Sequence, residues 1–298
     1  MHIRKGRSGS ERIYTHQDTE ANFPLGGIGT GTISIDSRGR LNDFELFNKP
    51  DKGNDMPYSF FALHTEPEDS KESSGSSVTR VLEAEMPKPY SHSHGFHAWN
   101  YRGAPRFRES LFKVRYPRAE LELEDPDVPF GLKLEAFSPF VPLDSDRSGI
   151  PAIYFRWTVK NLTSETQKVT LAFSAANLAG WVNERDVFTK PLFAEGSYNT
   201  FFKEDWGGGI FMKNRTIPQS STDFTEMGIA AISHDGQLIQ AKENWQEGQW
   251  WDGMQDFWND FSQSGLVRST DDLVSEKSSV HHSPFTIGSI ALSQSLAP

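Results

Sequence analysis

The sequence contains no cysteine among its 298 residues. This absence excludes a disulfide framework, a thiolate metal site and a cysteine nucleophile. Long apolar runs are also missing, and none approaches the roughly 18 residues that a membrane-spanning helix needs. A chain of this length can bury a sizeable core without disulfide or metal staples.

Positive charge is scarce, because 30 Lys and Arg residues stand against 40 Asp and Glu residues, which gives a net charge of −10. An acidic chain without a basic cluster argues against partners such as nucleic acid or anionic membrane surfaces. The start, MHIRKGRSGSERIYTHQ, is basic, but no apolar segment follows it as in a secretory signal. We therefore expect a flexible lead-in over residues 1–20 and a cytoplasmic location.

Alternation of apolar and polar residues is the main pattern. In PAIYFRWTVKN, residues 151–161, every second side chain from Ile153 to Val159 is apolar, which is typical of a half-buried strand. The segment 167–177 alternates in the same way after a short polar turn, so the two segments are predicted to form a hairpin. Similar segments predict further strands at 28–36, 41–47, 58–64, 111–116, 119–125, 130–138, 208–214, 227–235 and 285–293.

Many strands joined by Gly, Pro, Asn and Asp turns indicate an all-β fold. We predict a large antiparallel β-sandwich, supersandwich-like, over residues 21–298, with one or two short helices. The clearest helix lies in WDGMQDFWNDFSQSG, residues 251–265, and a shorter one is predicted near 181–187. Residues expected to define the first helix are an apolar stripe of Met254, Phe257, Trp258 and Phe261, a capping box of Asp252 and Gln255, and a terminal Gly265.

A glycine-rich stretch, FPLGGIGTGTISID, begins at residue 23 and contains Gly26, Gly27, Gly29 and Gly31. Its spacing fails the G-x-G-x-x-G dinucleotide pattern, and Thr32 stands where a phosphate loop needs lysine. Both motifs open a helix, whereas TISID alternates as a strand does. The glycines therefore predict bulges, or the close approach of another backbone or a ligand.

Histidines and carboxylates offer two further candidate sites. His92, His94 and His97 lack a carboxylate partner and match no standard zinc spacing, so we predict no metal and no cofactor. Asp43 and Glu45 share one face of a predicted strand, as a glycosidase carboxylate pair could. Any acidic strand has this spacing, however, and we nominate no catalytic residue.

Aromatic residues are abundant, with 8 Trp and 22 Phe. Trp245, Trp250, Trp251 and Trp258 fall in one short region. They are consistent with a sugar-stacking platform or with an apolar seam in the core or between domains, and the seam is favoured. The sequon that begins at Asn161 matters only in a secreted protein of a glycosylating host.

The motifs together resemble glycoside hydrolase family 116, which includes the non-lysosomal glucosylceramidases, or bile-acid β-glucosidases. FPLGGIGTGTISID followed by RGRLNDFELFNKP resembles the N-terminal signature of that family. LEAFSPFVPLDSDRSGIPAIYFRWTVKNLTSETQKVTLAFSAAN resembles it further along, in the expected order. The segment FELFNKPDKGN resembles bacterial relatives more than mammalian-type enzymes. The resemblance therefore implies the glycosidase class rather than ceramide specificity.

The resemblance implies an N-terminal β-sandwich followed by an (α/α)6-barrel. It also implies that the catalytic glutamate and aspartate of a retaining β-glycosidase lie in that barrel. We therefore expect a non-catalytic domain, truncated before the barrel. Its partners would be its own C-terminal catalytic domain and, through that domain, a carbohydrate or glycolipid substrate.

The domain is expected to support the barrel and to edge its active site. Candidates for the interface with substrate or barrel are Gly26, Gly27, Gly29, Gly31, Asn48, Asp51, Trp250 and Trp251. Two alternatives stay open. One is a free-standing carbohydrate-binding module that uses Trp250 and Trp251, and the other is a structural interaction domain with an exposed apolar face.

Overall fold

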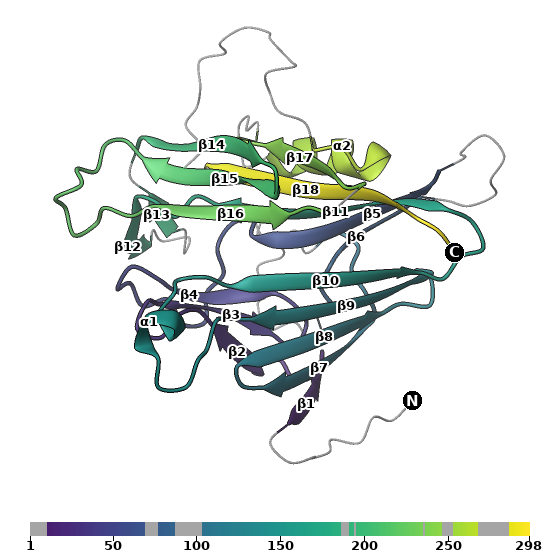
Figure 1. Ribbon diagram of the computed structural model, residues 1–298, viewed down its shortest axis with the longest axis horizontal. Helices are drawn as coiled ribbons and strands as arrows, with labels where there is room; N and C mark the ends of the chain where they lie inside the picture. Colours follow the sequence, from purple (N-terminus) through teal and green to yellow (C-terminus); the bar gives the residue numbers. More distant parts are fainter. Residues whose placement is uncertain are drawn as a thin grey trace, which may run out of the picture.

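The computed structural model describes residues 11–68, 77–86, 103–185, 191–193, 195–234, 236–245, 253–267 and 286–298. These residues form antiparallel sheets and two short helices, α1 (Ser145–Ser148) and α2 (Gly253–Ser264), as Figure 1 shows. The predicted all-β class with one or two short helices is confirmed. Within the same residues, neither helix has the length and apolar character needed to cross a membrane.

One five-stranded sheet, the lower sheet in Figure 1, holds the alternating segments of the first half of the chain. In β9 every second side chain from Phe130 to Ala136 is buried, as the sequence pattern predicts. The edge strand β1 lies within the expected lead-in, and its residues 12–15 pair with β7. The strand order is β1 (Arg12–Thr15), β7 (Glu109–Arg115), β8 (Arg118–Glu124), β9 (Phe130–Phe137) and β10 (Tyr154–Asn161).

A second five-stranded sheet, the upper sheet, has the order β17 (Leu238–Lys242), β18 (Ile287–Leu296), β11 (Gln167–Ala176), β5 (Phe60–Pro67) and β6 (Val78–Val81). The predicted hairpin between residues 151–161 and 167–177 is wrong. Strand β10 pairs with β9 in the lower sheet, whereas β11 pairs with β18 and β5 in the upper sheet. The Asn161 amide donates to the carbonyls of Glu165 (2.8 Å) and Leu296 (3.1 Å). These bonds tie the connection between β10 and β11 to the upper sheet.

Aromatic rings join the two large sheets. The ring of Phe61 on β5 stacks on Phe173 of β11 at 4.4 Å. The same ring meets Phe155 and Trp157 of β10 edge-on at 5.1 Å and 5.7 Å. Because such edge and offset contacts add to the free energy of burying aromatic area, this cluster stabilises the packing of one sheet on the other.

Helix α2 covers the opposite face of the upper sheet. Phe257 stacks on Trp245 at 4.7 Å and meets Phe60 edge-on at 5.8 Å, so the predicted apolar stripe is confirmed. The helix ends at Gly265, whose φ is 62° and whose N–H donates to the Phe261 carbonyl. Trp245 is buried in this core, as the seam interpretation predicts, whereas Asp252 lies outside the described residues.

Three smaller sheets flank the two large ones, so the fold is not strictly a two-sheet sandwich. The first buries Ile210 and Met212 in a separate core with Ala175 and Ile290. In the second, β12 replaces the helix predicted near 181–187, because its backbone pairs with β13. The sheets are β14 (Ser197–Glu204), β15 (Gly207–Asn214) and β16 (Met227–Ile232); β12 (Trp181–Arg185) and β13 (Pro191–Phe193); and β2 (Asn22–Leu25), β3 (Thr32–Asp36) and β4 (Leu41–Glu45).

We predict that Phe61→Ala lowers the free energy of unfolding by about 3–5 kcal/mol, because it leaves a cavity between the sheets. Urea denaturation followed by fluorescence measures this change. Leu162→Ala is the control, since its side chain is 57% exposed and the expected change is within about 0.5 kcal/mol. Equal destabilisation by both variants would contradict the role of the inter-sheet cluster.

Candidate functional site

The glycine loop, residues 26–31, is the hairpin connection between β2 and β3. Strand β3 begins at Thr32, so the strand predicted from residue 28 starts later than expected. Gly26 and Gly31 have φ values of 141° and 93°. A Cβ on Gly26 would lie 2.2 Å from the Gly31 carbonyl oxygen, and one on Gly31 would lie 2.7 Å from that of Glu45. Both glycines are therefore required by the loop's own conformation.

The loop lies against the segment that carries α1. The Ile28 N–H donates to the Ser148 carbonyl at 2.8 Å. A Cβ on Gly27 would lie 2.5 Å from the Ile150 carbonyl oxygen, whereas one on Gly29 would meet nothing within 4 Å. Three of the four glycines thus approach backbone of this chain, and Gly29 faces open space. Contact of the loop with a catalytic domain stays a prediction.

The neighbouring segment, residues 43–58, contains four non-glycine residues in the left-handed region. Their φ values are 49° for Asp43, 56° for Phe47, 58° for Asn48 and 54° for Tyr58. Such conformations are uncommon and concentrate at turns and binding sites. Of the two interface candidates here, Asn48 is exposed, but Asp51 is only 3% exposed. Asn48 therefore presents a side chain at the surface, and Asp51 is part of the turn's interior.

The carboxylates of Asp43 and Glu45 both contact Lys52. The Lys52 ammonium lies 2.6 Å from Glu45 Oε2 and 3.5 Å from Asp43 Oδ2. Its hydrogen bond with Glu45 raises the pKa of Lys52. Asp43 is buried and accepts a hydrogen bond from the Gly53 N–H at 2.7 Å. These contacts stabilise the 43–54 turn. They give Asp43 and Glu45 a structural role that requires no catalysis.

Exposed apolar side chains gather around the glycine loop and α1. Leu143 is 108% exposed, relative to a reference extended residue, and has a φ of 67°. The ring of Tyr116, on the β7–β8 turn, meets Phe140 at 5.1 Å. We define the apolar face as the exposed residues Ile28, Tyr116, Phe140, Val141, Leu143 and Ile150. A contiguous apolar patch of this kind indicates an interaction surface.

The apolar face is held rigidly. The Ser148 hydroxyl donates to the Val141 carbonyl and accepts from the Val141 N–H, both at 2.9 Å. Asp144 caps α1 by accepting from the Arg147 N–H at 2.9 Å. Sequence analysis missed Leu143. The stretch PLDSDRS, a turn followed by an N-cap, could have indicated an exposed loop but not its apolar partners.

The outer face of the lower sheet is different, because it carries alternating charges. Lys113 lies 2.7 Å from Glu122 across β7 and β8, and Arg156 lies 3.4 Å from Glu135 across β10 and β9. The charges continue through Lys133, Glu120 and Arg118. Charged residues are depleted at the cores of protein interfaces, so this face is suited to solvent.

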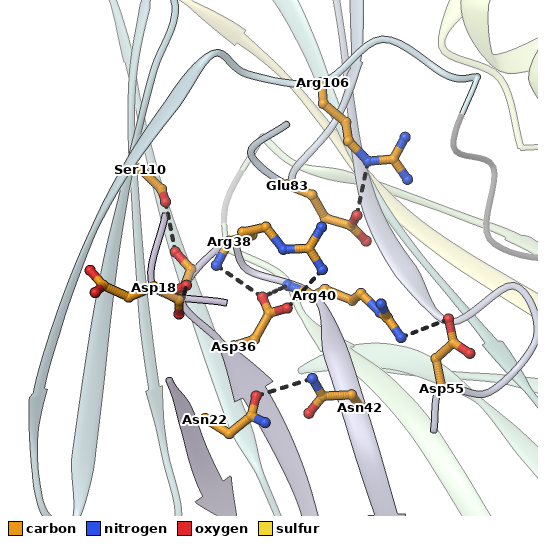
Figure 2. A network of polar contacts seen from close by, with 11 residues as sticks. Asp18, Asn22, Asp36, Arg38, Arg40, Asn42, Asp55, Glu83, Arg106 and Ser110 are labelled. Atoms are coloured by element: carbon orange, nitrogen blue, oxygen red, sulfur yellow. Dashed lines mark hydrogen bonds and ion pairs between the residues drawn. The ribbon is translucent and has the colours of Figure 1, made fainter. Parts of the chain in front are cut away.

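A buried polar network fixes the other end of β3 (Figure 2). The Asp36 carboxylate accepts from the backbone N–H groups of Arg38 and Arg40, each at 2.9 Å. It also pairs with the Arg38 guanidinium at 3.0 Å, and Arg40 pairs with Asp55 at 2.9 Å. The Ser110 hydroxyl donates to the Ser37 carbonyl at 2.6 Å, which ties the turn to the lower sheet. The β3–β4 turn is thereby held by charge-assisted hydrogen bonds.

Glu83 and Arg106 complete this network. The Arg106 Nε donates to Glu83 Oε2 at 2.9 Å, and Figure 2 shows the Arg38 side chain beside them. Burial acts to raise the pKa of Glu83, but the positive charges of Arg106 and Arg38 outweigh burial and lower it. Burial acts against the charge of Arg40 as well, yet Asp55 and Asp36 raise its pKa. Both groups are therefore ionised in the fold.

Several sequence candidates lie outside the described residues, namely His92, His94, His97, Trp250 and Trp251. Across the described ranges, no three His, Asp or Glu side chains are grouped to hold a metal ion. The prediction that His92, His94 and His97 form no metal site therefore stays untested.

The sequon asparagine Asn161 is 6% exposed, and its amide donates to two backbone carbonyls. Asn214, which begins the sequence Asn-Arg-Thr, is buried in a similar turn, where its Oδ1 accepts from the Thr216 N–H at 2.9 Å. Sequence analysis did not single out Asn214. Both asparagines act as turn residues in the folded chain.

A comparison with protein families matches residues 22–298 to the family described as beta-glucosidase 2, glycosyl-hydrolase family 116 N-term. The match covers nearly the whole chain and confirms the resemblance carried by the glycine-rich stretch. It includes the glycine loop, the apolar face and the buried network.

We predict that Gly27→Ala destabilises the chain more than Gly29→Ala. The new Cβ at residue 27 meets the Gly149–Ile150 backbone, whereas at residue 29 the cost is only that of a left-handed alanine, about 1–2 kcal/mol. Chemical denaturation of both variants measures the difference. A smaller loss for Gly27→Ala than for Gly29→Ala would contradict the contact between loop and α1 segment.

We also predict that Glu83→Gln lowers the free energy of unfolding by about 3–5 kcal/mol at neutral pH, because it removes the carboxylate that pairs with Arg106 in the buried network. The folded pKa of Glu83 lies below the reference value of 4.5, so its contribution is complete above that value. It is lost as the pH falls through the folded pKa.

The difference in the free energy of unfolding between wild type and Glu83→Gln should therefore become smaller as the pH falls. Urea denaturation over a pH series measures it. The exposed Glu124→Gln serves as the control and should change stability little at any pH. A difference that stays constant or widens as the pH falls would contradict the assignment.

Proposed function

Because this chain belongs to the N-terminal domain family of glycosyl hydrolase family 116, we propose that it is a non-catalytic domain of a β-glucosidase that packs against the catalytic domain. The family match over residues 22–298 is the observation that carries this proposal. The pairing of Asp43 and Glu45 with Lys52 supports this proposal, since it gives both carboxylates a structural role in the 43–54 turn.

We assign docking on the catalytic domain to the apolar face. Its centre is apolar, whereas the outer face of the lower sheet is charged. The α1 cap and the Ser148 hydroxyl hold the backbone that presents Leu143 and Val141 before binding. A pre-ordered backbone loses little conformational entropy on binding, which favours affinity. Leu143 is therefore the expected anchor of the interface.

The glycine loop adjoins this face, and we propose that the loop and the exposed Asn48 edge the mouth of the active site. Gly29 leaves open space beside it, into which the backbone of a partner or a sugar ring can come close. The substrate would be a glucoside that reaches this domain only through the catalytic domain. The lack of cysteine fits a reducing compartment, and we place the protein in the cytoplasm.

The matched variants Ile28→Asp and Leu162→Asp test the docking surface in the parent enzyme. Both native side chains are 57% exposed, but only Ile28 belongs to the apolar face. We expect Ile28→Asp and Leu143→Asp to lower kcat/KM for an aryl β-glucoside at least about tenfold, because a charge is buried at the interface. Leu162→Asp should retain the wild-type value.

The 298-residue chain alone should release no aglycone from the same glucoside. Hydrolysis by this chain that is abolished by substituting one of its carboxylates would overturn the non-catalytic role. Equal behaviour of Ile28→Asp and Leu162→Asp would overturn the docking assignment.

A further inference from the structure

A second exposed apolar surface lies on the outer face of the sheet β14–β15–β16, away from the glycine loop. We define the aromatic ridge as Phe202, Trp206 and Phe211. Trp206 is 47% exposed and Phe211 is 48% exposed. The ring of Phe202 stacks on Phe211 at 4.5 Å and lies 6.1 Å from Trp206, so the three rings form one row.

A glycine of β15 leaves room for this row of rings. Phe202 on β14 lies opposite Gly209 on β15. A Cβ on Gly209 would lie 2.6 Å from the Phe202 ring, so the ring rests on bare backbone. The inward residues Ile210 and Met212 already fill the core beneath the sheet. The rings of the ridge therefore keep part of their aromatic surface exposed to solvent, because other side chains already fill the core.

The residues beside the ridge on the same face of the sheet have small side chains. Next to Phe211 and Gly209, the paired residues on β16 are Gly228 and Ala230, which are small and exposed. Thr200 shares the outer face with Phe202, and it is exposed too. These small residues leave a shelf beside the aromatic row.

Hydrogen-bonding groups stand at the end of the ridge. Glu204, the last residue of β14, and Asp205 are exposed and directly precede Trp206, which lies in the β14–β15 turn. The Lys213 ammonium lies 5.6 Å from the centroid of Phe211. Aromatic surface with carboxylates and a hydroxyl beside it suits a ligand that has both apolar faces and hydroxyl groups. A pyranose ring has this combination.

We propose that the aromatic ridge is an accessory binding site for a neutral, glucose-containing oligosaccharide. Trp206 supplies the stacking surface, Glu204 and Asp205 accept hydrogen bonds from sugar hydroxyls, and the Gly228–Ala230 shelf leaves room for a second ring. The choice of glucose rests on the proposed function, whereas the site itself rests on the ridge. The apolar face differs, because four of its six side chains are aliphatic, namely Ile28, Val141, Leu143 and Ile150, and such a surface suits a protein partner.

Titration of the 298-residue chain with β-1,4- and β-1,3-linked glucose tetrasaccharides tests this site. Calorimetry and tryptophan fluorescence measure binding. We expect saturable binding of at least one tetrasaccharide, weakened at least about tenfold by Trp206→Ala or Phe211→Ala. Tyr154→Ala is the matched control, because Tyr154 is a 43% exposed aromatic residue on the lower sheet. It should bind as the wild type does.

Absence of saturable binding to both tetrasaccharides would overturn the proposal, as would binding that Trp206→Ala leaves unchanged. Sedimentation of the same variants adds a third test. Self-association of the chain that Trp206→Ala abolishes would make the ridge a contact between copies and would also overturn the proposal. Glucose release is followed in the same samples. Hydrolysis would contradict the non-catalytic role while leaving the measured binding at the ridge intact.

Discussion

The buried charge network around the Asp36–Arg40 turn is the constraint on which the position of the candidate site depends. Buried charges are tolerated only where each has its partner, so the network permits one placement of this turn. The Ala84 N–H also donates to the Arg38 carbonyl at 2.8 Å, which binds the turn to the chain after β6. Because β3 runs from the turn to the glycine loop, the network determines where the loop emerges.

The glycine-rich stretch and the RGR segment that follows it therefore share one structural explanation. The glycines fold the hairpin loop at one end of β3, and the RGR segment holds the other end. Gly39 has a φ of 92°, and a Cβ there would lie 2.6 Å from the Leu121 side chain. Both ends of β3 are therefore held in place by contacts within this chain.

Sequence patterns predicted elements well where one face of a strand or helix is buried. Phe257 and Phe261 of α2 and the alternation of β9 and β10 are such cases. Alternation does not encode the pairing partner, however, and β10 and β11 therefore looked like a hairpin although they lie in different sheets. The exposure of Leu143 and the position of Phe202 over Gly209 depend on which face of a loop or hairpin each side chain occupies, and alternation alone does not predict this.

The two exposed surfaces differ in chemistry and are supported by different cores. The apolar face rests on the loops at one end of the lower sheet, whereas the aromatic ridge lies on a sheet with its own small core around Ile210. Side chains that share no partners contribute almost independently to stability and binding. Substitutions on the ridge should therefore leave the apolar face unchanged. This independence allows the proposed protein contact and the proposed sugar contact to be tested separately in the same chain.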